Sequence, residues 1–166
     1  MVTQDERSQT SSSIEGAFCY AVVDLASAAA LRPVVPNLMS SVAEPLLARS
    51  MAPQVLAVGP WLVDLAQVPE VARTLTAWGS SVPWGYYVYS RVDIVSVRQS
   101  LRKFNLARVE GSKTDVLFRY WDPRVIRVFL HGTTNAQRAK FLDWIDRVEW
   151  ADGSFLDKAE AADADR

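Results

Sequence analysis

The sequence predicts a single α/β domain, layered around a mixed sheet that includes an antiparallel hairpin. Short apolar runs typical of strands alternate along the chain with segments whose apolar residues recur at helical spacing. The 166 residues suffice for one hydrophobic core, and the charged fraction of 22% is ordinary for a globular protein. We expect this domain at residues 16–150, between a flexible N-terminal segment at 1–15 and an acidic flexible tail at 151–166.

The overall totals exclude several classes of function. A formal net charge of −1 provides no general attraction to nucleic acid or to an anionic membrane. The single cysteine, Cys19, excludes an intrachain disulfide framework and a multi-cysteine metal site. The N-terminal segment lacks the apolar core of a signal peptide, and no apolar run approaches the roughly 20 residues that cross a bilayer. We therefore expect a cytoplasmic protein.

The N-terminal part of the chain predicts a central strand followed by a helix and an irregular connection. Residues 17–23 are continuously apolar, which suits a strand buried on both faces. The alanine-rich residues 25–31 favour a helix, whereas four prolines make residues 33–53 irregular. Within that connection, Ser41 and Glu44 resemble a capping box and indicate a short helix.

The middle of the chain predicts a strand, then a helix, then a second strand. Residues 54–58 form the first strand, and an apolar run at residues 61–65 follows a turn at 59–60. The helix spans residues 68–78, because a proline lies near its start and a glycine follows its end. Aromatic and β-branched residues favour the second strand at residues 84–90.

The C-terminal part predicts helices on either side of a hairpin. Asp93 begins an amphipathic helix. Residues 110–113 include a glycine and connect strands at 106–109 and 114–121, which is typical of an antiparallel hairpin. The last helix begins at a capping box headed by Thr134.

The densest local pattern lies where the second hairpin strand ends. Asp122 can accept the free amide hydrogens of a new helix, and Pro123 suits the first helical position. Arg119 precedes this corner, and we expect it to pair with a nearby carboxylate, with Asp24 as the candidate. The corner is either a functional site or a structural junction.

Few residues could support catalysis. His131, the only histidine, lies in the last turn of a predicted helix, where the helix dipole favours its charge. Cys19 lies inside the first strand, where a cysteine behaves as a small hydrophobic residue. Asp24 ends that strand, where α/β sheets often place functional groups, and is equally suited to capping a helix. The enzymatic alternative is a small hydrolase using Asp24, Asp122 and Arg119, which requires the carboxylates to converge in a pocket with a shifted pKa.

Two further features indicate binding. Basic residues predominate between positions 91 and 108, and Arg98 and Arg102 share a helical face. Such a stripe could bind an acidic partner or nucleic acid, or be the solvated side of an amphipathic helix.

Six tryptophans are many for this length, and indole rings near turns either close a core or anchor a partner. The three nearest to turns or strand ends are Trp61, Trp84 and Trp121.

Three motifs occur in a recognisable order. They are Ala21-Val22-Val23-Asp24, Gly59-Pro60-Trp61-Leu62-Val63 and Phe118-Arg119-Tyr120-Trp121-Asp122-Pro123-Arg124-Val125. Over roughly residues 16–150 the chain resembles the type VI secretion effector chaperones, also called adaptor proteins. The family's recurring residues correspond here to Asp24, Pro60, Trp61, Arg119, Asp122, Pro123 and Arg124.

The resemblance implies a non-enzymatic role. Such adaptors bind a toxic effector in the producing bacterium and help load it onto the spike protein of the valine-glycine repeat family. They work in the cytoplasm by protein–protein contact, so we expect no cofactor, no metal, no nucleic acid and no membrane partner. The expected partners are the secreted toxin effector and the spike protein.

Overall fold

Residues 14–108, 111 and 113–159 are described by the computed structural model of the chain. The strands are β1 (Phe18–Asp24), β2 (Ala43–Pro45), β3 (Pro60–Asp64), β4 (Gly85–Ser90), β5 (Leu106–Arg108), β6 (Asp115–Leu117), β7 (Arg147–Glu149) and β8 (Phe155–Asp157). The α-helices are α1 (Pro53–Leu56), α2 (Pro69–Trp78), α3 (Ile94–Arg102), α4 (Pro123–Gly132) and α5 (Asn135–Phe141). Short 3-10 helices lie at Ala29–Leu31, Val35–Asn37 and Gly79–Ser81.

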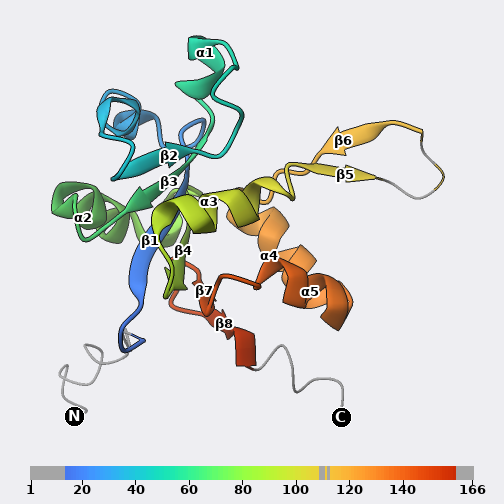
Figure 1. Ribbon diagram of the computed structural model, residues 1–166. Coiled ribbons are helices and arrows are strands. Elements are labelled where there is room, and N and C mark those ends of the chain that lie inside the picture. Colours follow the sequence, from blue (N-terminus) through green and yellow to red (C-terminus); the bar gives the residue numbers. More distant parts are fainter. Residues whose placement is uncertain (1–13, 109–110, 112, 160–166) are drawn as a thin grey trace, which may run out of the picture.

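The central element is β1, which lies inside a six-stranded sheet of order β2-β3-β1-β4-β7-β8. A separate two-stranded hairpin, β5–β6, extends away from this sheet (Figure 1). The α/β class and the hairpin are as the sequence predicts. A mixed sheet was expected, but every pair of described strands is antiparallel, so the helices here do not serve as crossovers between paired parallel strands.

Alternate residues of β1 enter two cores on opposite faces of the sheet. The first core contains Tyr20 and Val22 together with residues of α3, α4 and α5, among them Val97, Leu101, Ile126, Leu130 and Phe141. The second core contains Ala21 and Val23 together with residues of α2 and the 3-10 helices, among them Leu31, Val35, Val71 and Leu75. The sheet is therefore the middle of three layers, which explains why β1 is apolar on both faces.

Helices with strong capping signals begin where the sequence predicts. Asp93 accepts a hydrogen bond from the Ser96 amide at the start of α3, and Thr134 accepts one from the Gln137 amide at the start of α5. Helix α2 is followed by Gly79, whose φ of +49° favours glycine and ends the helix. Within the described ranges, no helix combines the length and the apolar character needed to cross a membrane.

Three predicted elements differ from the structure. Residues 54–58, predicted as a strand, lie in and after α1, because Pro53 occupies the first helical position. Residues 25–31 form a turn and a single 3-10 helix, since the side chain of Asp24 accepts a hydrogen bond from the Ala26 amide and fixes the turn. The second hairpin strand ends at Leu117 rather than at residue 121, because a local bond from the Tyr120 amide to the Phe118 carbonyl turns the chain.

The structure also describes part of the segments predicted to lie outside the domain. The N-terminal segment predicted as flexible lies outside the described residues up to residue 13. Strand β8 lies within the predicted tail, where it pairs with β7, and Arg147 forms an ion pair with Asp157. The six-stranded sheet therefore extends past residue 150, while residues 160–166 lie outside the described part.

Candidate functional site: the corner at the start of α4

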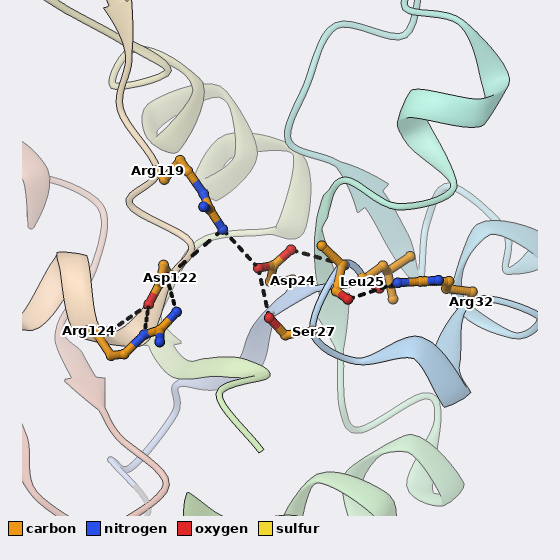
Figure 2. Close-up of polar contacts among 8 residues, drawn as sticks. Asp24, Leu25, Ser27, Arg32, Arg119, Asp122 and Arg124 are labelled. Atoms are coloured by element: carbon orange, nitrogen blue, oxygen red, sulfur yellow. Dashed lines mark hydrogen bonds and ion pairs between the residues drawn. The ribbon is translucent and has the colours of Figure 1, made fainter. Parts of the chain in front are cut away.

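The corner at the start of α4 gathers charged residues from two distant parts of the chain. Asp24 ends β1, Arg119 lies between β6 and α4, and Asp122 and Arg124 flank the first helical residue, Pro123. Figure 2 shows the Arg119 guanidinium directed at the two carboxylates, with Arg124 folded against Asp122. We call these four charged residues the corner cluster.

Asp122 is the N-cap of α4, as the sequence predicts. Its Oδ1 accepts a hydrogen bond from the Arg124 amide at 3.0 Å, while Pro123 occupies the position whose amide would have no helical partner. The Arg124 side chain returns to the same carboxylate, with Nε 2.9 Å from Oδ1 and Nη2 2.7 Å from Oδ2. The hydrogen bonds from the Arg124 side chain hold the pKa of Asp122 below its usual range.

Asp24 closes the turn after β1 and is almost completely buried. It accepts hydrogen bonds from the Ala26 amide at 3.1 Å and from the Ser27 hydroxyl at 3.3 Å. Burial raises the pKa of Asp24, and these hydrogen bonds together with Arg119 oppose that rise. Arg32 also stabilises the turn, because its Nε donates to the Leu25 carbonyl at 2.7 Å (Figure 2).

Arg119 joins the two halves of the corner cluster. Its Nη2 lies 3.6 Å from Oδ2 of Asp24 and 4.0 Å from Oδ2 of Asp122. The predicted ion pair between Arg119 and Asp24 is therefore confirmed. Because half of the Arg119 side chain is exposed, each pair contributes little stability by itself, but together they connect the end of β1 to the start of α4.

Of the predicted family residues, only Trp61 lies away from the corner. Pro60 lies opposite Asp24 in the register of β1 and β3. Trp61 lies opposite Val23 and enters the second core, where its indole nitrogen donates to the Leu56 carbonyl at 2.9 Å. The hydrogen bond and the burial give Trp61 a structural role in fixing α1 against the sheet.

A largely apolar hollow of about 250 Å³ opens beside the corner. It is lined by Ser80, Val82, Pro83, Gly85, Pro123, Arg124, Arg127, Trp150, Ala151 and Asp152. The Arg127 guanidinium lies 4.7 Å from the centre of the Trp150 ring and forms an ion pair with Asp152 at 2.9 Å. The lining includes neither Asp24 nor Asp122.

This geometry bears on the hydrolase hypothesis. Asp24 and Asp122 converge on Arg119, and the pKa of Asp24 is shifted upward, as that hypothesis requires. It also requires a shared pocket, whereas both carboxylates are buried and accept hydrogen bonds from neighbouring protein groups. The arrangement is suited to holding two chain segments together.

The other residues considered for catalysis occupy structural positions. His131 lies in the last turn of α4, as predicted, and its ring stacks on Trp150 with the centroids 5.9 Å apart. Burial raises the pKa of the Cys19 thiol to about 11, so the thiol is protonated at neutral pH. Trp84 and Trp121 are buried in the two cores. In the described part of the chain, no group of three or more His, Cys, Asp or Glu residues could hold a metal ion.

Sequence reasoning missed a second charged cluster, formed by Glu44, Arg49 and Arg98. Glu44 was interpreted as part of a capping box, but it lies buried in β2 and pairs with Arg98 at 3.2 Å and Arg49 at 2.6 Å. Arg98 is also buried and donates to the Pro45 carbonyl at 2.7 Å, so it does not belong to an exposed stripe as expected. Because Arg98 lies on another element, far from Glu44 in sequence, no local pattern could have indicated that pairing.

Together, the fold and the corner define a three-layer α/β domain in which the corner cluster forms a structural junction. A family model described as "Domain of unknown function (DUF4123)" matches residues 19–140, and the chain belongs to this family. The matched range includes all four residues of the corner cluster, along with Pro60, Trp61 and Pro123. No curated protein and no solved structure matched the chain.

Proposed function

We propose that the chain is a cytoplasmic chaperone and adaptor that binds a toxic effector and helps load it onto the type VI secretion spike protein. The observation that carries this proposal is the family match over residues 19–140. That range contains all three motifs in which the sequence resembles the effector adaptors. The proposed partners are the effector and the spike protein of the valine-glycine repeat family.

Surface chemistry supports a role in binding without catalysis. The carboxylates of the corner cluster accept hydrogen bonds from protein groups, so their acceptor capacity is engaged within the fold. Large apolar side chains, in contrast, are exposed on several elements, where they are available to pack against a partner. They include Met39, Leu106, Leu117, Val128, Trp144 and Phe155.

Co-purification tests the proposed partners directly. The tagged chain would be co-expressed with the products of the adjacent reading frames, as candidate effectors, and with the spike protein, and the complexes would be separated by size exclusion. We expect the effector to elute in a complex with the chain and to remain soluble only when the chain is present. Recovery of the chain alone, under low salt and with soluble effector in the lysate, would contradict the proposal.

A matched variant separates the adaptor role from hydrolysis. Asp24→Asn preserves the shape of the side chain and an oxygen that can accept from the Ala26 amide, but it removes the carboxylate. For an adaptor, we expect this variant to restore effector secretion in a deletion strain about as well as the wild type, once melting shows that it is folded. A folded Asp24→Asn protein that binds the effector but no longer supports secretion would favour the hydrolase.

A further inference from the structure

The β5–β6 hairpin exposes an unusual amount of apolar side chain for its size. Leu106, Val116 and Leu117 are 61%, 44% and 54% exposed. Leu106 lies opposite Leu117 and Ala107 lies opposite Val116, so both faces of the ribbon carry apolar groups. A two-stranded ribbon is only marginally stable alone, and an uncovered apolar ribbon is a typical binding surface.

The edges of the hairpin offer backbone groups to a further strand. The Phe118 amide donates to the Asn105 carbonyl, which makes Leu106 and Leu117 a non-hydrogen-bonded pair. Hydrogen-bonded and non-hydrogen-bonded pairs alternate along an antiparallel ribbon. Four residues therefore direct their N–H and C=O groups outward: Leu106 and Arg108 on β5, and Asp115 and Leu117 on β6. No third strand pairs with either edge among the described residues, so each edge can accept an added strand.

Charge indicates what kind of strand would bind. Residues 102–119 contain five basic and two acidic residues, a formal charge of +3, whereas the whole chain carries −1 and the remainder therefore −4. Lys103, Arg108 and Lys113 are exposed along or beside the hairpin. The pair between Arg108 and Asp115 at 3.0 Å is already counted in this sum, and Arg119 is offset by Asp24 and Asp122 outside the segment, so the surplus is carried by the remaining basic residues. The surplus attracts carboxylates over about 10 Å at moderate ionic strength.

We propose that the β5–β6 hairpin binds an extended segment of a partner protein in which aliphatic and acidic residues alternate, as a third strand. The inference rests on the proposed function and assigns this surface to the recognition of the effector. A protein strand fits better than nucleic acid, because the exposed apolar side chains of β5 and β6 are aliphatic and single-stranded nucleic acid is held mainly by aromatic stacking.

The decisive measurement does not require the effector to be known. A short, blocked, fluorescein-labelled peptide of alternating glutamate and valine is titrated with the full chain, and binding is followed by anisotropy. A lysine–valine peptide and a labelled oligodeoxythymidine serve as comparison probes. We expect binding of the glutamate–valine peptide alone, weakening as NaCl rises from about 50 to about 500 mM.

Variants locate the binding to the hairpin. Leu106→Pro and Leu117→Pro each remove one outward-facing amide without removing a bond between β5 and β6, and we expect at least one of them to weaken binding about tenfold, equivalent to about 1.4 kcal/mol. The double variant Leu106→Ser/Leu117→Ser preserves the backbone and should weaken binding at either edge. Lys103→Glu/Lys113→Glu should remove the salt dependence. Val128→Ser is the matched control, because Val128 is 74% exposed on α4.

The outcomes separate this inference from the proposed function. Any of four outcomes would overturn the inference. The first three are that the chain does not bind the peptide, that all hairpin variants bind it equally, and that the chain prefers the oligonucleotide. The fourth is self-association of the chain that is lost in the serine variant. An effector that co-purifies equally with wild type and the serine variant would overturn it while the adaptor proposal remains. If the chain binds the peptide through the hairpin but retains no effector, the result would support the proposed binding surface and contradict the adaptor role.

Discussion

Replacing Asp122 with alanine removes a carboxylate that both caps α4 and faces Arg119. The Arg124 amide, which donates to Oδ1 at 3.0 Å, would lose its acceptor at the start of the helix. Arg119 would remain paired with Asp24, and the freed Arg124 side chain, 73% exposed, would be hydrated. The substitution therefore leaves no buried cation without a partner, and the cost is dominated by the cap.

The magnitude follows from these contacts. Loss of an aspartate cap costs about 1 kcal/mol, within a range of roughly 0.5–2 kcal/mol. The ion pair with the exposed Arg124 side chain is screened by solvent and adds little. For a chain of this length, about 1 kcal/mol lowers the melting temperature by about 2–4 °C. Because the pKa of Asp122 is lowered on folding, its stabilising contribution is present above the ordinary pKa of about 4 and declines as pH falls below it.

Urea unfolding at neutral pH measures this cost, with the midpoint falling and the slope unchanged. Asp122→Asn is the informative comparison, because asparagine caps a helix about as well as aspartate and should preserve most of the stability. Asp143→Ala removes an exposed aspartate and should change stability by less than about 0.5 kcal/mol. An Asp122→Ala protein that unfolds at the wild-type midpoint, or an Asn variant as unstable as the Ala variant, would refute the capping argument.

Three further predictions concern other parts of the fold. Gly85→Ala should destabilise by more than about 3 kcal/mol in urea unfolding, because its Cβ would lie 1.8 Å from the Val22 carbonyl oxygen, whereas Gly132→Ala in α4 should stabilise by about 0.5 kcal/mol. Arg98→Met should cost about 3 kcal/mol by leaving the buried Glu44 carboxylate short of a partner, and Arg98→Met/Glu44→Leu should recover part of that loss in the same assay. Hydrogen bonds from Ser154 lower the pKa of Asp152 to about 2, so the deficit of Asp152→Asn in a pH series should be full above about pH 4, decline as pH falls, and vanish only below about pH 2.

The parts of this structure that the sequence predicts are those determined within a few residues. Asp93, Asp122 and Thr134 cap helices because each side chain reaches an amide two or three residues ahead, which a local pattern records. The continuous apolar run of β1 likewise indicates burial on both faces. The pairing of Asp24 with Arg119 was predicted only as a candidate, and the structure brings the end of β1 to the segment that precedes α4.

Two of the incorrect predictions concern residues whose structure depends on tertiary contacts. Glu44 pairs with Arg98 from another element, so its neighbours in sequence indicated only a capping box. Strand β8 is three residues long and forms because β7 offers a free edge and Arg147 an ion-pair partner for Asp157. A segment this short has no periodicity of its own, and its pairing therefore depends on tertiary structure.

The corner cluster gains a specific role when it is considered with the hairpin. Arg119 follows Leu117 by two residues, and the intervening Phe118 packs against Phe129 of α4 with ring centroids 5.0 Å apart. The base of the hairpin is thus fixed to α4 by an aromatic contact, and Arg119 fixes it to β1 through Asp24. A ribbon that projects with exposed apolar side chains can present them in one orientation only if its base is rigid. We therefore infer that the corner cluster orients the hairpin for the binding proposed above, because its contacts fix the base of the hairpin and its acceptor groups are used within the fold.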